Sequence, residues 1–369
     1  MELQQVDGGD IEILWKSYAE KDPFAKSALQ IQLDDAVFES AFKVQPRIPD
    51  EPKNLRDVIP SGKGRISQED YLDRVRRGQR LGMKSLLHLI NSERSVDWEK
   101  PSTVCVIGGG PTLQDEVGAL RRLVNRGAKV FAVNKSHDWL LKRGFRCDYA
   151  ALLDPKEWVA DYIDTESLLR KARANAGKHF VQPKYLIASQ CHEKVLEKFR
   201  LNPHAYMWHA AAGLGESLLL NTEFAGEEWV NIAGASVIGL RAAGICHGLG
   251  FRTIHLFGID GSAKPGNKLY SYDKPHIEPT WRDFEVKLTS GWNRKFTANH
   301  HMARAVYEFE DMLREWDAHI KAGTMEPFSI RVHGNPEHSA IGMVAAGMGI
   351  HADPTENERY GKPPEARAA

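Results

Sequence analysis

The stretch "TVCVIGGGPTLQDEV", Thr103–Val117, decides the fold of this chain. Its first five residues are mostly β-branched and apolar, which predicts a buried strand. Three glycines, Gly108–Gly110, follow the strand, and glycine permits a positive φ and a close approach of the backbone to a ligand. Thr112 and Asp115 then occupy the N-cap and N3 positions of a predicted helix. A strand, a glycine turn and a helix start together favour an anion site, because unpaired N–H groups point at the turn.

The turn matches neither of the two common phosphate-binding patterns. Pro111 and Leu113 stand where a GxGxxG pattern requires other residues, and the lysine of a P-loop is missing. A phosphate site therefore remains one interpretation, and a tight turn without a ligand remains the other.

The rest of the central region predicts an α/β fold with a parallel sheet. From Thr103 to about His338, short β-branched runs alternate with amphipathic runs. The predicted strands are "TVCVI", "KVFAV", "YAALL", "YLIAS", "WVNIA", "TIHLF" and "SIRV".

Composition divides the chain into three predicted parts. Residues 1–98 form a helical accessory region, in which "SQEDYLDRVRRGQRLGMKSLLHLI" begins with Ser67 as N-cap and continues as one helix. Residues 99–349 form the α/β domain. Residues 350–369 are polar and rich in proline and small residues, which predicts a disordered tail.

Charge and cysteine content exclude several classes of protein. Lysine plus arginine equal aspartate plus glutamate, at 49 each, so there is no global signal for nucleic acid or acidic membranes. The four cysteines form no CxxC pair, which favours reduced core thiols and a cytoplasmic location. Neither a signal peptide nor a membrane span is predicted. The sequence leaves the oligomeric state open.

Further polar residues follow the predicted strands. Asn134 and Asp154 come directly after two of them, and Gly258 and Asp260 end a third. Open α/β sheets bind ligands at the carboxyl ends of their strands, so these residues are candidate ligand contacts. Asparagine and aspartate are also common turn residues, which is the alternative explanation for each of them.

Four stretches, "VIGGGPTL", "AVNKSHDWLLKRGFRCDYAALLDP", "GASVIGLRAAGICHGLGFRTIHLFGIDG" and "RVHGNPEHSAIG", resemble the family called 6-hydroxymethylpterin diphosphokinase MptE-like. The resemblance covers roughly Thr103 to Gly342. The same ordered pattern is similar to that of bacterial sialyltransferases that use a CMP-activated sugar. Both resemblances imply a Rossmann-like parallel sheet flanked by helices.

The resemblance also implies roles for particular residues. By similarity to the sialyltransferases, the glycine turn holds the donor phosphate, a tyrosine loop stabilises the leaving phosphate, and one of two adjacent histidines is the general base. The implied catalytic residues are His300, His301, Tyr270 and Tyr272. The implied nucleotide or substrate contacts are Gly108, Gly109, Gly110, Pro111, Thr112, Asn134, Lys135, Asp154, Ser236, Gly258 and Asp260.

Two departures from the family patterns bear on the chemistry. Lys135 replaces an amide of the sialyltransferases, and Asp154 stands alone where the pterin enzymes carry an Asp-rich "DLD". A diphosphokinase needs Mg²⁺ to bridge the β- and γ-phosphates, and only Asp154 and Asp260 are candidate ligands for it. No cofactor is otherwise implied.

These observations favour a transferase that moves a glycosyl group from a nucleotide-activated sugar to a hydroxyl of a small-molecule or glycan acceptor. A magnesium-dependent diphosphokinase that uses ATP is the second hypothesis. The third is a nucleotide-binding protein without chemistry.

Overall fold

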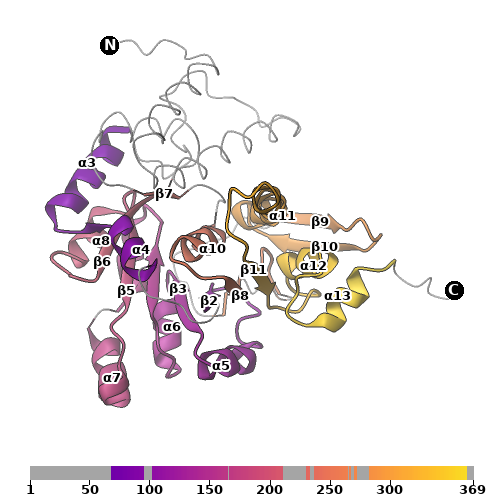
Figure 1. Ribbon diagram of the computed structural model, residues 1–369, viewed down its shortest axis with the longest axis horizontal. Coiled ribbons are helices and arrows are strands. Elements are labelled where there is room, and N and C mark those ends of the chain that lie inside the picture. Colours follow the sequence, from indigo (N-terminus) through magenta and orange to yellow (C-terminus); the bar gives the residue numbers. More distant parts are fainter. Residues whose placement is uncertain are drawn as a thin grey trace, which may run out of the picture.

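The computed structural model describes residues 68–94, 102–164, 166–210, 230–232, 237–264, 266, 270–271 and 282–363. Its main sheet has the strand order β1-β6-β5-β4-β3-β2-β8-β11, and the short strand β7 pairs with β6 (Figure 1). The strands are β1 (Lys84–Ser85), β2 (Thr103–Ile107), β3 (Lys129–Val133), β4 (Tyr149–Leu152), β5 (Lys184–Ala188), β6 (Ala205–Ala210), β7 (Asn231–Ile232), β8 (Thr253–Phe257) and β11 (Ser329–Val332). All described pairings in this sheet are parallel, which confirms the predicted α/β class.

Helices cover both faces of the sheet. In Figure 1, α10 lies above the central strands, and α5 and α6 lie below them. The helices are α3 (Gln68–Arg80), α4 (Leu86–Arg94), α5 (Val117–Asn125), α6 (Ser136–Lys142), α7 (Ser167–Ala176), α8 (Glu193–Lys198), α10 (Ile238–Gly248), α11 (His300–Lys321), α12 (Ala340–Gly347) and α13 (Pro354–Tyr360), with the 3-10 turns η2 (Glu157–Tyr162) and η3 (Gly177–His179). Two faces are covered because crossovers between parallel strands are right-handed, so the covered face changes when the strand order reverses.

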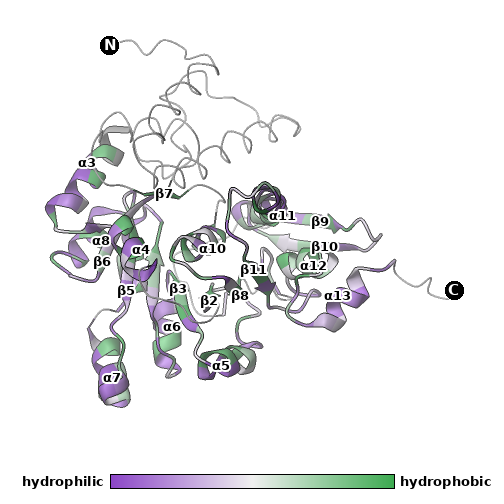
Figure 2. Cartoon of the chain, viewed as in Figure 1, coloured by the Kyte–Doolittle hydropathy of each residue, from purple (hydrophilic) through white to green (hydrophobic). Residues whose placement is uncertain are grey.

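The sheet forms the centre of the hydrophobic core. The residues of β2 from Val104 to Ile107 are all fully buried, as expected for a strand covered on both faces. In Figure 2 the helix α12 is largely green, whereas the outer helix α7 carries much more purple. Burial of apolar side chains on both faces therefore holds the layers together.

The register brings the predicted ligand contacts to one edge. Ile107 at the end of β2 lies opposite Phe257 of β8 and Ala132 of β3. Val133 lies in turn opposite Ala151 of β4. The strand order reverses between β2 and β8, and open α/β sheets bind ligands at such a switch point.

One predicted helix is wrong, and some strands were not predicted. The stretch predicted as one helix from Ser67 contains α3, then β1, then α4, because the chain turns at Gly82 with a φ of 80°. Ser67 itself lies outside the described residues. The prediction also missed β6 and a separate antiparallel hairpin, β9 (Arg282–Lys287) with β10 (Asn293–Ala298).

The segment before Thr103 contributes to the main sheet and its core. Strand β1 pairs with β6 at the edge of the sheet. Glu93 in α4 is buried, accepts a hydrogen bond from the hydroxyl of Tyr149 at 2.8 Å and forms an ion pair with Lys184. The division of the chain at residue 98 stays a prediction, and these contacts cross it.

The tail predicted as disordered is partly helical. Residues 354–360 form α13, which Asp353 caps by accepting a hydrogen bond from the N–H of Thr355 at 2.9 Å. Tyr360 is buried and packs against Trp292 with ring centroids 4.9 Å apart. The helix forms because an N-cap, a proline at its start and an aromatic anchor coincide. Residues 364–369 lie outside the described part.

All four cysteines are buried and unpaired, as predicted for core thiols. Burial raises the pKa of Cys105 to about 12, so its thiol stays protonated at neutral pH. Across the described ranges, no helix combines the length and the apolar character that crossing a bilayer requires.

Candidate functional site

The glycine turn is held tightly against the end of β8. The N–H of Gly108 donates to the carbonyl of Phe257 and that of Gly110 to the carbonyl of Gly258, both at 2.7 Å. A Cβ on Gly108 would lie 2.3 Å from the Gly258 oxygen, and one on Gly110 would lie 2.3 Å from a carboxylate oxygen of Asp260. The segment after β8 therefore lies so close to the turn that only glycine fits at positions 108 and 110. A side chain at Gly110 would therefore meet Asp260 and the backbone of Gly258.

Asp260 anchors the turn through Thr112. Its Oδ2 accepts a hydrogen bond from the Thr112 N–H at 3.0 Å, and its Oδ1 accepts one from the Thr112 hydroxyl at 2.6 Å. The Asp260 side chain is buried, and this burial raises its pKa to about 6 although the bonds from Thr112 act in the opposite direction. Asp260 therefore holds the turn in place from a site where its charge is poorly solvated.

The helix after the turn begins later than predicted. Residues 111–116 form turns, and α5 starts at Val117 with Glu116 as an N-cap that makes no side-chain capping bond. Thr112 was predicted to be the N-cap, but its hydroxyl donates to Asp260. The N-terminus of α5 is thus separated from the glycine turn, and its dipole does not begin at the predicted phosphate site.

The described end of the tyrosine loop lies on the glycine turn. The N–H of Ser271 donates to the carbonyl of Gly109 at 2.9 Å, and the Ser271 hydroxyl donates to the carbonyl of Gly110 at 2.8 Å. These bonds bring Tyr270 next to the turn. Gly109 is half-buried, and within the described part of the chain its N–H has no hydrogen-bond partner. Gly109 therefore offers a backbone donor where the loop meets the turn.

Asn134 combines backbone strain with an unpaired polar atom. It follows β3 with a φ of 51°, and its N–H donates to the carbonyl of Ala151 at 2.9 Å. Its side-chain Oδ1 is buried and finds no hydrogen-bond partner among the described residues. A left-handed φ is unusual for a residue other than glycine and is concentrated at functional sites. This side chain is suited to hydrogen-bond a ligand at the edge of the sheet.

Asp154 acts electrostatically on two tyrosines beside this edge. Burial, followed by the charge of Asp154, raises the pKa of Tyr162 to about 12. Burial and then Asp154 likewise raise the pKa of Tyr270. Both hydroxyls therefore keep their protons at neutral pH, and the Tyr270 hydroxyl can donate a hydrogen bond to an anion.

For the other predicted site residues that lie in the described ranges, the structure gives the position in the chain and the burial. Lys135 is half-buried at the start of α6, and His301 is exposed in the first turn of α11. Pro111 is buried within the turn. Ser236, Tyr272 and the side chain of His300 lie outside the described residues.

The carboxylates predicted to bind Mg²⁺ have other interactions. Both oxygens of Asp260 accept hydrogen bonds from Thr112, so a metal ion there would have to share these oxygens with the glycine turn. In the ranges that the structure describes, no three His, Cys, Asp or Glu side chains cluster in a way that could hold a metal ion.

Sequence reasoning assigned no role to the stretch "RVHGNPEHSAIG", although it was part of the family resemblance. Gly334 in this stretch lies against the Thr112–Asp260 pair, and the hydroxyl of Ser339 lies 3.4 Å from the Asp260 carbonyl oxygen. Ser271 was also missed. The position of Ser271 directly after Tyr270 was the available signal.

Part of the chain matches the model of a known family. Residues 82–265 match the model of the family described as 6-hydroxymethylpterin diphosphokinase MptE-like. Among solved structures, the chain is similar to the MAf glycosyltransferase from Magnetospirillum magneticum AMB-1, with a TM-score of 0.41 and 16% identity. That match covers 64% of this chain and 32% of the glycosyltransferase, so the chain spans about a third of its length. No curated protein matches the chain. Over residues 82–265, just under half of its length, this chain is similar to the MptE-like family.

Proposed function

We propose that this protein is a nucleotide-dependent transferase whose donor binds at the carboxyl edge of the sheet. The family description names a diphosphokinase, which supports a transferase-type function. The observation that carries the proposal is Asn134, with its strained backbone and its buried, unpartnered Oδ1 beside the switch point of the sheet. The Oδ1 of this amide can therefore accept a hydrogen bond from a ligand.

We propose that glycosyl transfer from a nucleotide-activated sugar is the reaction. In this reaction an acceptor hydroxyl loses its proton to a base and attacks the anomeric carbon, while the bond from that carbon to the donor phosphate breaks. The Gly109 N–H and the Tyr270 hydroxyl would donate hydrogen bonds to the departing phosphate, whose negative charge increases in the transition state. Asn134 and Asp154 would hold the sugar or nucleotide. Tyr272, Ser236 and Lys135 remain proposed contacts of the donor or acceptor.

Diphosphate transfer from ATP to a hydroxymethyl group is the second candidate, because the family carries that name. It would need Mg²⁺, which bridges the phosphates of ATP and offsets their charge. Asp154 and Asp260 would be the ligands. The hydrogen bonds from Thr112 to both oxygens of Asp260 favour glycosyl transfer over this alternative.

A donor assay separates these reactions. The protein is incubated with a panel of nucleotide sugars and hydroxyl acceptors, with and without EDTA, and in parallel with ATP, Mg²⁺ and 6-hydroxymethylpterin. We expect release of the nucleotide from a nucleotide sugar, with turnover that survives EDTA. If product forms only in the incubation with ATP, and EDTA abolishes it, the reaction is diphosphate transfer and not glycosyl transfer. Nucleotide binding without turnover of any donor would support the third, non-catalytic hypothesis.

Replacing Asn134 with glycine should weaken donor binding about tenfold, because the lost hydrogen bond to the ligand is worth about 1.4 kcal/mol. Glycine tolerates the φ of 51° and therefore removes the amide without adding strain. Leu201, the other described non-glycine residue with a positive φ, supplies the matched control Leu201→Gly. Titration calorimetry measures both. Equal donor affinity in Asn134→Gly and the wild-type protein would remove Asn134 from the site.

The general base is proposed to be His300 or His301. Both residues lie in the first turn of α11, where adjacent side chains point about 100° apart, so at most one can face the donor. Replacing that histidine with alanine should lower turnover by roughly two to four orders of magnitude with little change in donor affinity. The other substitution should have almost no effect. Full activity in both variants, measured in the donor assay, would show that neither is the base.

A further inference from the structure

The segment that follows β11 packs against the glycine turn from outside the matched family region. Gly334 has a φ of 125°, and a Cβ on it would lie 2.7 Å from the Thr112 hydroxyl and 3.0 Å from Asp260 Oδ1. The backbone at Gly334 therefore contacts the same hydrogen-bonded pair that anchors the turn. A shift of the Gly334 backbone would therefore change the geometry of the hydrogen bonds between Thr112 and Asp260.

His351 fixes the carbonyl of Gly334. Its ring is buried, and its Nε2 lies 3.0 Å from the Gly334 oxygen. Its Nδ1 accepts a hydrogen bond from the N–H of Asp353 at 3.1 Å, so in the neutral ring the proton is on Nε2. The Nε2–H then donates to Gly334. The backbone of Asp353 thus determines the tautomer that makes this bond.

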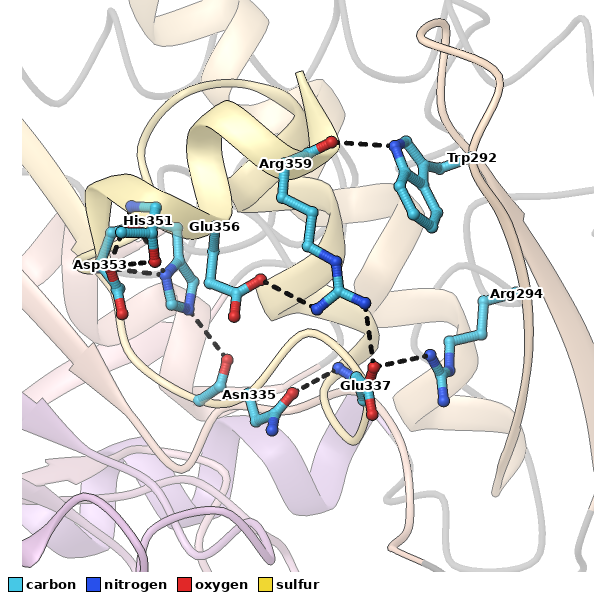
Figure 3. Close-up of polar contacts among 10 residues, drawn as sticks. Trp292, Arg294, Asn335, Glu337, His351, Asp353, Glu356 and Arg359 are labelled. Atoms are coloured by element: carbon cyan, nitrogen blue, oxygen red, sulfur yellow. Dashed lines mark hydrogen bonds and ion pairs between the residues drawn. The ribbon is translucent and has the colours of Figure 1, made fainter. Parts of the chain in front are cut away.

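Helix α13 holds His351 in place; Figure 3 shows His351 beside Asp353, which caps this helix, and the contact of Arg359 with Glu337. Asn357 accepts a hydrogen bond from the His351 N–H at 2.9 Å and donates one to the His351 carbonyl at 3.0 Å. Arg359 of the same helix lies 3.2 Å from Glu337, which also lies 3.8 Å from Arg294 of β10. These contacts connect α13 to the loop that contains Gly334.

We propose that His351 is a positioning residue for the glycine turn. It acts through Gly334 on the Asp260–Thr112 pair, and so holds the backbone of residues 108–113 in the conformation that binds the donor. The binding of a donor rests on the proposed function. The coupling of His351 to the turn does not, and it can be measured without any ligand.

Hydrogen exchange in the full chain tests the coupling directly. The amides of Gly108, Gly110 and Thr112 are hydrogen-bonded in the turn, so their exchange reports on its opening. In His351→Ala we expect exchange in peptides covering residues 106–116 to accelerate about tenfold, with peptides covering β4 and β5 unchanged. In His351→Gln the side-chain amide can donate to Gly334 and should restore slow exchange. The matched control is His319→Ala, which removes a half-buried histidine that bonds to Thr324.

Nucleotide affinity gives the second readout. If the proposed function holds, His351→Ala should weaken binding of the best nucleotide donor about tenfold and His351→Gln should recover most of it. Accelerated exchange in a protein that binds no nucleotide would reject the proposed function and keep the positioning role. The inference would be overturned if exchange in the turn were unchanged in His351→Ala. It would also be overturned if exchange accelerated as much in His351→Gln as in His351→Ala. Should His351→Ala unfold globally, Asn357→Ala loosens His351 more mildly and must show the same localised acceleration.

Discussion

Replacing Asp260 with alanine is expected to lower the free energy of unfolding by about 3 kcal/mol at pH 4, where the folded protein does not pay for a buried charge, because it leaves the buried N–H and hydroxyl of Thr112 without their partner. Urea denaturation followed by circular dichroism measures the change. The variant should also lose nucleotide affinity, since the turn is no longer anchored. A loss below about 0.5 kcal/mol would show that Asp260 does not anchor the turn.

The matched control is Asp260→Asn, which retains an oxygen for the Thr112 N–H and does not titrate. Burial raises the pKa of Asp260 from 3.8 to about 6. Between these two values the folded protein holds a proton that the unfolded chain releases. The stability that this group contributes is therefore present below pH 4 and is lost as the pH rises through about 6, by about 3 kcal/mol in total. In Asp260→Asn, the difference in stability between pH 4 and pH 6.5 should be smaller by about 2 kcal/mol, because part of the total change lies outside this interval.

Removing residues 1–96 is expected to abolish cooperative folding. The deletion takes away β1 and α4, and with them the fully buried side chains of Leu86 and Leu89. Each such side chain contributes about 1.5–3 kcal/mol, and a native domain is stable by only about 5–15 kcal/mol. The hydroxyl of Tyr149 and the ammonium of Lys184 would also lose Glu93. Thermal unfolding and size-exclusion chromatography of a chain that begins at Asp97 measure the outcome.

A soluble product that unfolds cooperatively and binds nucleotide would instead support the accessory region predicted from the sequence. The point variant Glu93→Gln in the full chain separates the contribution of the polar contacts of Glu93 from that of the apolar contacts of α4. It should lower the free energy of unfolding far less than the deletion does, because it leaves the apolar contacts of α4 intact.

The central strands could be predicted from the sequence because their signals are local. β2, β3, β8 and β11 are β-branched runs bounded by turn residues, and their predicted bounds agree with the structure. The prediction missed β6, "AYMWHA", because it mixes aromatic, polar and small residues without a clear period. The β9–β10 hairpin was missed because charged residues interrupt both strands, which lie outside the main sheet.

The site was predictable only in part. The edge of the sheet and Asn134 follow from strand order, which the alternation of strands and helices indicates. The start of α5 could not be predicted in this way. Thr112 does not cap the helix because its hydroxyl donates to a carboxylate that lies 148 positions away in the sequence. No local pattern indicates which distant side chain will engage a turn hydroxyl. The contacts of Gly334 and His351 were unpredictable for the same reason.

The pairing of β2 with β8 has a consequence for the order of events during synthesis. Thr103 lies beside Thr253, and the glycine turn that follows β2 contacts Asp260 and Gly334. These are contacts of high sequence separation, which form late because a long loop must close before they stabilise the chain. A ribosome must therefore translate more than two hundred residues past the turn before the turn can take its final conformation. Nascent chains that stall before Gly334 will contain most of the sheet but not an assembled glycine turn.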